Sequence, residues 1–244
     1  NEVEGEIYSF ATRCENVQEQ EDHPMVVHKA VADPDTMYLH QAMKQPDKNE
    51  CLAAMQKEIN DQMKNGNFKI IKRSSLPISA RILPAVWQMK RKRDLLMRQV
   101  KKYKARLNVN GSRQRKHLDY DRTYAPVASW PAIRLLLILS SIYNWHTIQL
   151  DYVLAYSQAP VERTLFMRMP KGVEVEGDNT EEHVLQIEQN VYGQKQAGRV
   201  WHKHLVSKLS SIGFVQSKID PCVFYKGRII YVLYTDNTIL AGPN

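Results

Sequence analysis

Two aspartates are candidates for a catalytic or metal-binding role, because each directly follows an apolar, strand-like run. Asp151 follows residues 148–150, and Asp236 follows residues 231–234. Two such strands lying side by side would bring the carboxylates together. Oxygen ligands of this kind suit Mg²⁺, which binds few carboxylates and completes its shell with water and phosphate oxygens. The pattern therefore indicates metal-assisted phosphoryl transfer, although an aspartate in a turn is more often a simple turn former.

Other familiar catalytic motifs are missing from the sequence. It contains no GxxxxGK[ST], GxGxxG, HExxH or GxSxG, and its eight histidines are scattered. The three cysteines are far apart and form no CxxC pair, which favours reduced thiols over a disulfide framework or a zinc site. Of the common catalytic sites, only the aspartate pair is left as a candidate.

The elements that would position the two aspartates follow from periodicity and turn residues. Helices are expected over 49–64 and 129–144, with a third that ends at Gly213, and the second should be buried because it is apolar nearly all round. Strands are expected over 68–72, 85–88, 146–150, 222–225 and 229–234. The predicted class is α+β, an antiparallel sheet covered by two helices. The expected core of this part comprises Leu136, Leu137, Trp145 and Trp201.

A basic segment between Lys90 and Lys116 carries twelve Lys and Arg against Asp94 alone. Within it, apolar residues at 103, 105, 107 and 109 alternate with polar or cationic ones, the period of a half-buried strand. Residues 90–93 and 99–110 are spaced as two arms of a hairpin. A nucleic-acid backbone is one expected partner, and a charged edge strand that resists aggregation is the other interpretation. The residues expected to bind nucleic acid are Lys90, Arg91, Lys92, Arg93, Lys102 and Arg113.

Composition is that of an ordinary globular protein, with 43% hydrophobic and 25% charged residues among 244. The net charge of +8 favours a polyanionic partner. No apolar run is long enough for a membrane helix and no secretory signal is visible, so we expect an intracellular protein without a membrane partner. Residues 1–36 are acidic and poor in apolar positions, which predicts a disordered linker. Because the chain starts at Asn1 and ends after an apolar run, we expect a piece of a longer polyprotein.

At this point the ordered motifs carry a family resemblance over residues 47–242. They include KNGNFKII (64–71), YKARLNVNGSRQ (103–114), LDYDRTYAPVASWPAIRLLL (118–137), QLDYVLAY (149–156), VYGQKQAGRVWH (191–202), GFVQSKIDPCVFYK (213–226) and YTDN (234–237). The chain resembles the reverse transcriptase domain of copia-type long-terminal-repeat retrotransposon polyproteins.

The resemblance implies an RNA-directed DNA polymerase with the right-hand polymerase fold. Residues 37–242 would form its fingers (47–130) and palm (131–242), with a fingers insertion near 160–200, while thumb and ribonuclease H are absent. The implied cofactors are two Mg²⁺ or Mn²⁺ ions. The implied partners are an RNA or DNA template with a DNA primer, deoxynucleoside triphosphates and the rest of the polyprotein. Family resemblance places such proteins in cytoplasmic virus-like particles.

The resemblance also implies roles for individual residues. Asp151, Asp236 and the carbonyl of Tyr152 would bind metal, with Asn237 as the third member of the catalytic set. Lys104 and Arg106 would clamp the incoming triphosphate. Tyr156 would be the steric gate against a ribose 2′-hydroxyl. The remaining residues expected around the nucleotide are Tyr152, Ala155, Tyr192, Gly193 and Lys195.

Three departures from the family pattern bear on activity. Asn237 stands where the family has a second aspartate, so one carboxylate of three is neutral. Gly198 replaces a common proline, and Thr235 a common valine. We therefore also consider a decayed or truncated remnant that binds nucleic acid without catalysis, and a genomic relic that folds poorly.

Overall fold

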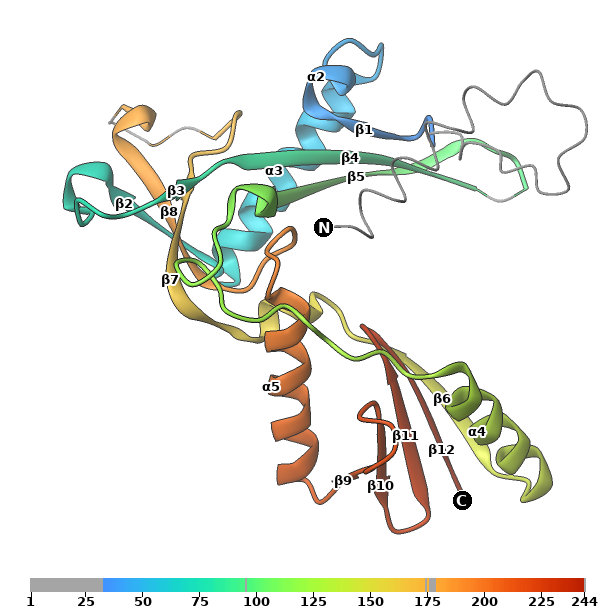
Figure 1. Ribbon diagram of the computed structural model, residues 1–244. Helices are drawn as coiled ribbons and strands as arrows, with labels where there is room; N and C mark the ends of the chain where they lie inside the picture. Colours follow the sequence, from blue (N-terminus) through green and yellow to red (C-terminus); the bar gives the residue numbers. More distant parts are fainter. Residues whose placement is uncertain (1–32, 95, 174, 176–178, 244) are drawn as a thin grey trace, which may run out of the picture. The chain divides into compact units, whose positions relative to one another are not determined.

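The computed structural model describes residues 33–94, 96–173, 175 and 179–243. The chain divides into two units, Asn1–Thr36 and Met37–Asn244, and the fold below is that of the second (Figure 1). The linker predicted over residues 1–36 lies outside the described residues except for its last four.

The basic segment forms the predicted hairpin. Strands β4 (Ala85–Arg93) and β5 (Val100–Val109) pair antiparallel, and β1 (Thr36–Tyr38) completes a three-stranded sheet in the order β1-β4-β5. A short helix α2 (Leu39–Ala42) links β1 to the long helix α3 (Lys48–Lys64), which matches the predicted helix. The buried face of α3, with Cys51, Met55 and Ile59, joins Trp87, Met89, Ala105 and Leu107 in one hydrophobic core.

A second, four-stranded sheet was not predicted from the sequence as a unit. Its order is β2-β8-β7-β3, formed by β2 (Phe68–Lys72), β3 (Ile82–Leu83), β7 (Pro160–Arg168) and β8 (His183–Gln189). The β3–β7 pair is parallel, and the other two pairs are antiparallel. Residues 160–189 thus join strands that lie about a hundred positions earlier in the chain. Single 3-10 turns, η2 (Arg73–Ser75) and η5 (Thr180–Glu182), flank these strands.

The third sheet carries both candidate aspartates. It has five antiparallel strands in the order β6-β12-β11-β10-β9, made of β6 (His146–Asp151), β9 (Val215–Gln216), β10 (Val223–Lys226), β11 (Ile229–Tyr234) and β12 (Asn237–Gly242). Helices α4 (Trp130–Ile142) and α5 (Ala197–Ser211) pack against this sheet (Figure 1). The expectation of an antiparallel sheet with helices is confirmed at this level.

The two helices contact different faces of the five-stranded sheet. Phe214, which follows α5, packs edge-on against Tyr231, with ring centroids 5.9 Å apart. Helix α4 instead borders a cavity that Ile230 and Val232 line from the opposite side of β11. Asn237 is the register partner of Asp151 on one side and of Tyr234 on the other. These three side chains therefore lie on the same face of the sheet as Val232, which is two positions before Tyr234 in β11.

The expectation that the 129–144 helix is buried all round was wrong. Of α4, only Leu136 and Ser140 are buried, whereas Leu137, Ile138 and Ile142 expose 49%, 55% and 68% of their surface. Leu137 is therefore not core, and Trp145 is only partly buried. The reason is that only the side of α4 with Leu136 and Ser140 is covered, and the rest of its apolar surface is exposed among the described residues. Trp201 and Leu136 are core as predicted.

Candidate active site

The two predicted aspartates converge at one end of the five-stranded sheet. Asp151 ends β6 and is the register partner of Asn237, the first residue of β12. Asp236 lies in the two-residue turn between β11 and β12. The Tyr152 amide donates to the Asp236 carbonyl at 2.9 Å, which ties the end of β6 to this turn. The Asn237 side-chain amide donates to a carboxylate oxygen of Asp236 at 3.1 Å.

Aromatic side chains contact the turn between β11 and β12 and the strands next to it. The indole N–H of Trp201 donates to the Thr235 carbonyl at 3.1 Å, and its ring meets Tyr152 edge-on with centroids 5.1 Å apart. The hydroxyls of Tyr152 and Tyr231 lie 2.9 Å apart, and Thr238 donates to Tyr231 at 3.0 Å. Burial raises the pKa of Tyr231, so its hydroxyl stays protonated. Thr235 adopts a positive φ of 58°, and these contacts keep that strained residue in place.

The donor set at this end of the sheet fits a hard divalent cation. Asp151 and Asp236 supply carboxylate oxygens and Asn237 an amide oxygen, with the first and last exposed. Mg²⁺ accepts such a set because it binds one or two carboxylates and keeps several waters. No group of three or more His, Cys, Asp or Glu suited to a metal assembles in the described part of the chain.

Tyr156 and Tyr192, both predicted around the nucleotide, lie together. Tyr156 is on the 3-10 turn η4 (Ala155–Gln158), and its ring centroid is 5.3 Å from that of Tyr192. On the other side, the guanidinium carbon of Arg106 lies 5.5 Å from the Tyr192 centroid, a cation–π distance. The three side chains form a column that joins β5 to the aspartate end of the sheet.

Burial and nearby charges shift the pKa values of the two tyrosines in this column. Burial raises the pKa of Tyr192; Arg106 opposes this shift, whereas Asp236 and Asp151 add to it. Burial also raises the pKa of Tyr156, with Asp236 contributing next. Both phenols are therefore neutral hydrogen-bond donors at pH 7. The buried Nε of Arg106 has no hydrogen-bond partner among the described residues.

Two glycines allow the backbone contact that positions Tyr192. Val109 at the end of β5 donates its amide to the Tyr192 carbonyl at 2.9 Å. Gly193 has φ +88°, and a Cβ there would lie 2.1 Å from the Val109 carbonyl oxygen. A Cβ on Gly111 would lie 2.0 Å from the Gly193 carbonyl oxygen. Only glycine fits either position, which explains why Gly193 matters as backbone rather than as a contact surface.

Two further predicted nucleotide residues have structural partners. Ala155 is buried in the hydrophobic core that also contains Trp201. The ammonium of Lys195 lies 5.3 Å from the ring centroid of Tyr120, and its backbone amide donates to Gln114 at 2.8 Å. Lys195 thus borders the connector between the β4–β5 hairpin and α4.

The cationic residues of the hairpin divide between its two faces. Lys102, Lys104 and Arg106 alternate with the partly buried Tyr103 and the buried Ala105 and Leu107, as predicted. They share their face with Lys90 and Lys92. The structure places Arg91 on the opposite face, where its guanidinium makes two hydrogen bonds of 2.6 and 2.7 Å to Asp47. Arg93 donates to the Arg98 carbonyl, and Arg113 lies on η3 (Gly111–Arg113) beyond β5. We therefore regard Arg91 as structural.

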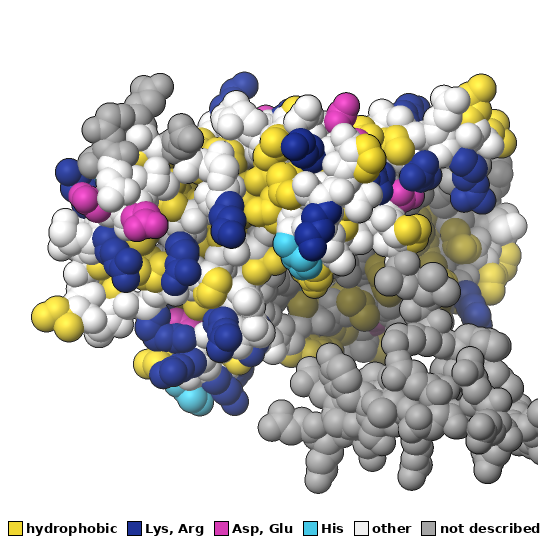
Figure 2. Space-filling view, turned by 90° about the horizontal axis from the view of Figure 1, so that it is seen from above, with side chains coloured by type: hydrophobic (Ala, Val, Ile, Leu, Met, Phe, Trp, Pro, Cys, Tyr) yellow, Lys and Arg dark blue, Asp and Glu magenta, His cyan; other side chains and the backbone are white. Residues whose placement is uncertain are grey.

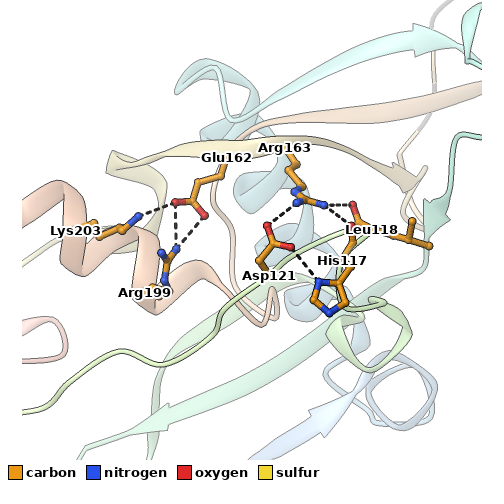
Figure 3. Close-up of polar contacts among 7 residues, drawn as sticks. All are labelled: His117, Leu118, Asp121, Glu162, Arg163, Arg199 and Lys203. Atoms are coloured by element: carbon orange, nitrogen blue, oxygen red, sulfur yellow. Dashed lines mark hydrogen bonds and ion pairs between the residues drawn. The ribbon is translucent and has the colours of Figure 1, made fainter.

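Ion pairs that sequence reasoning missed fasten the connector over residues 114–128 and join β7 to α5. Arg163 of β7 pairs with Asp121, which also approaches His117, and it donates to the carbonyls of His117 and Leu118 (Figure 3). Glu162, next to Arg163, pairs with Arg199 and Lys203 of α5 (Figure 3). Arg81 pairs with the buried Asp119. No local signal could reveal these pairs, because all but the His117–Asp121 pair join residues 37 to 42 positions apart.

Comparison with known proteins identifies the family of the chain. Residues 67–244 match the family of reverse transcriptases (RNA-dependent DNA polymerases), and the chain belongs to this family. It is similar to the retrovirus-related Pol polyprotein from transposon TNT 1-94 of Nicotiana tabacum, with 33% identity over 84% of this chain and 15% of that protein. The Pol polyproteins from transposons RE2 and RE1 of Arabidopsis thaliana are 34% and 32% identical over 78% of this chain and 13% of theirs. The predicted resemblance to the reverse transcriptase domain of copia-type retrotransposons is confirmed.

The chain spans about one seventh of the length of the curated relatives it matches. Within the described residues, no helix combines the length and apolar character that crossing a bilayer requires.

Proposed function

We propose that this chain is the fingers and palm part of an RNA-directed DNA polymerase that extends a DNA primer on an RNA or DNA template. The observation that carries the proposal is the convergence of Asp151 and Asp236 at one end of an antiparallel sheet, in a chain of the reverse transcriptase family. The sheets β1-β4-β5 and β2-β8-β7-β3 would be the fingers, and the five-stranded sheet with α4 and α5 the palm. The pairing of residues 160–189 with β2 and β3 supports a fingers insertion.

Two divalent cations, Mg²⁺ or Mn²⁺, would be held by Asp151 and Asp236, with the Tyr152 carbonyl as a further ligand. When bound, such ions lower the pKa of a primer hydroxyl and stabilise charge on a leaving pyrophosphate. The exposure of Asp151 at the end of an edge strand leaves it accessible to substrate oxygens. Asn237 offers an oxygen without a charge, and its amide N–H is directed to Asp236, so it supports metal binding less well than a carboxylate.

The incoming nucleotide would lie between the hairpin and the palm. Lys104 and Arg106 on β5 would take the triphosphate, because charge-assisted hydrogen bonds to phosphate are short and strong. The column of Arg106, Tyr192 and Tyr156 supports this placement, since it joins those cations to the aspartates. Tyr156 would exclude a ribose 2′-hydroxyl by steric clash, and Ala155 and Lys195 would flank the nucleotide and template.

The template and primer would follow the cationic surface of the hairpin. One whole face of the protein, seen from above in Figure 2, carries many Lys and Arg among few Asp and Glu side chains, in keeping with the net charge of +8. Lys90, Lys92 and Lys102 project from the same face of the hairpin as the proposed triphosphate ligands. As part of a Pol polyprotein, the chain would act with the remaining segments of that polyprotein, in cytoplasmic particles.

A second candidate function is nucleic-acid binding without catalysis. The observation that favours it is Asn237, which removes one of three negative charges from the metal site. Under this alternative, the cationic hairpin would still bind template, but no nucleotide would be added.

Primer extension separates the two functions. The chain is incubated with a labelled DNA primer on an RNA template, the four deoxynucleoside triphosphates and Mg²⁺ or Mn²⁺. The catalytic function predicts extension that Asp151→Asn abolishes, whereas Asp61→Asn, an exposed acid on α3, leaves it unchanged. The binding function predicts salt-dependent template binding with no extension by any form, including Asn237→Asp.

A further inference from the structure

The turn that carries Asp236 is strained at the residue before it. Thr235 has φ +58°, a left-handed backbone conformation that glycine adopts freely and a β-branched residue rarely does. Positive φ angles are the reason that two-residue hairpin turns favour Gly, Asn and Asp. The turn between β11 and β12 therefore needs contacts from outside the hairpin to keep its conformation.

Two hydrogen bonds from outside the hairpin reach this turn, one to each of its two carbonyls. The Tyr152 amide, just beyond β6, donates to the Asp236 carbonyl at 2.9 Å. The Trp201 indole N–H, from helix α5, donates to the Thr235 carbonyl at 3.1 Å. Trp201 is thus the side-chain anchor of the strained residue itself.

The same indole also contacts the segment that carries Asp151. Its ring meets the Tyr152 ring edge-on, with centroids 5.1 Å apart, and Tyr152 directly follows Asp151 in the sequence. Trp201 is only 2% exposed, and it belongs to the hydrophobic core that Leu205 of α5 also enters. One buried side chain therefore touches both segments that present the candidate metal ligands.

Trp145 shows that packing alone does not require a partner for an indole N–H in this core. Trp145 packs against the same hydrophobic core, yet its buried Nε1 has no hydrogen-bond partner among the described residues. Packing therefore does not by itself explain the directed bond from Trp201. A phenylalanine at position 201 would fill most of the same space, but it could not donate to the Thr235 carbonyl.

We propose that Trp201 is a positioning residue for the metal site. Through the Thr235 carbonyl it fixes the turn, and with the turn it fixes the place of the Asp236 carboxylate relative to Asp151. The inference rests on the proposed function, in which these two carboxylates hold the divalent cations. Trp201 touches no reacting atom, but an error of about 1 Å in the placement of such groups can cost about a hundredfold in rate.

The first test uses the metal-free chain and therefore does not depend on the polymerase assignment. Hydrogen exchange of the Tyr152 amide, whose acceptor is in the turn, is measured by NMR in the parent and in Trp201→Phe. Loss of the indole bond should speed this exchange about tenfold, the effect of roughly one hydrogen bond. The Ser217 amide, which donates to the Val223 carbonyl at 2.8 Å beside β9, should exchange at an unchanged rate.

The second test measures Mn²⁺ affinity by electron paramagnetic resonance and then the kinetics of nucleotide addition. Trp201→Phe should bind Mn²⁺ about tenfold more weakly and lower kcat by about tenfold or more, with KM for deoxynucleoside triphosphates changed less than about twofold. Trp145→Phe removes an unpaired N–H from the same core and should match the parent in every readout. Urea midpoints establish that both variants fold.

Three results would overturn the proposal. They are an unchanged Tyr152 exchange rate in Trp201→Phe, faster exchange without weaker Mn²⁺ binding, and equal losses in Trp201→Phe and Trp145→Phe. The variant Asp151→Asn separates these results from the polymerase assignment. A parent that binds Mn²⁺ no better than Asp151→Asn would contradict the proposed metal site itself, whereas Tyr152 exchange would still report whether the indole anchors the turn.

Discussion

The ion pair between Asp47 and Arg91 should contribute measurably to the stability of the hairpin and α3. Asp47 is the N-cap residue of α3, yet its carboxylate makes no cap hydrogen bond because Arg91 takes both oxygens. This contact, strengthened by Tyr103, lowers the pKa of Asp47 from 3.8 to about 2. A shift of this size corresponds to roughly 2.4 kcal/mol. Since Arg91 and Asp47 still expose 13% and 20% of their side chains, water screens the pair, and we expect about 1–2 kcal/mol.

Urea unfolding of the parent chain and of Asp47→Asn measures this contribution. Because the pKa is lowered on folding, the stabilisation is present above about pH 4 and is lost as the pH falls toward 2. The two proteins should differ by about 1–2 kcal/mol at pH 7 and converge in acid. The matched control is Asp61→Asn, which breaks an exposed pair with Lys57 and should cost less than about 0.5 kcal/mol. Equal losses for the two variants, or a difference that persists unchanged at pH 2, would refute the reasoning.

Two further predictions concern the column beside the aspartates. Replacing Gly193 with Ala should lower the free energy of unfolding in urea by about 3 kcal/mol or more, because the new Cβ would meet the Val109 carbonyl. The control Gly66→Ala has a similar φ but open space around it, and should cost only about 1 kcal/mol. Equal costs for the two variants would contradict the Gly193–Val109 contact. Tyr192→Leu should weaken deoxynucleoside triphosphate binding about tenfold and shift the Arg106 Nε–H resonance by removing the ring, whereas Tyr192→Phe should restore both. An unmoved Arg106 resonance in Tyr192→Leu would show that the ring does not position the guanidinium.

Local patterns predicted the hairpin and the helices because their signals are local. Alternation over residues 102–109 reports a strand with one buried face, and β5 has that pattern of burial. The stop of α3 at Asn65 and Gly66 was likewise readable from spacing alone. Its face was predicted in part, because Met55 and Ile59 are buried whereas Leu52, expected on the same face, is exposed. The convergence of Asp151 and Asp236 was also predicted, but the expectation that their strands lie side by side was wrong. Strand β12 lies between β6 and β11, and it brings the turn with Asp236 beside the end of β6.

Features that depend on distant partners could not be predicted. The four-stranded sheet pairs Phe68 with Ile187 and includes a parallel pair, and no residue of β2 indicates that partner. The apolar surface of α4 predicted burial, but burial depends on what covers a helix, and the sheet covers only one side of it. Arg91 was grouped with its cationic neighbours because charge alone does not reveal which face of a strand meets Asp47.

The single-turnover rate of nucleotide addition by Asn237→Asp, compared with that of the parent chain, tests the central claim most directly. Asn237 and Asp151 face each other across β12 and β6, so the new carboxylate would join the other two at the proposed metal site. If Asp151 and Asp236 hold catalytic metal ions, restoring this charge should raise the Mg²⁺-dependent rate by about two orders of magnitude. A rate that stays at the level of Asp151→Asn, with template binding and folding intact, would contradict the assignment of this end of the sheet as a polymerase active site.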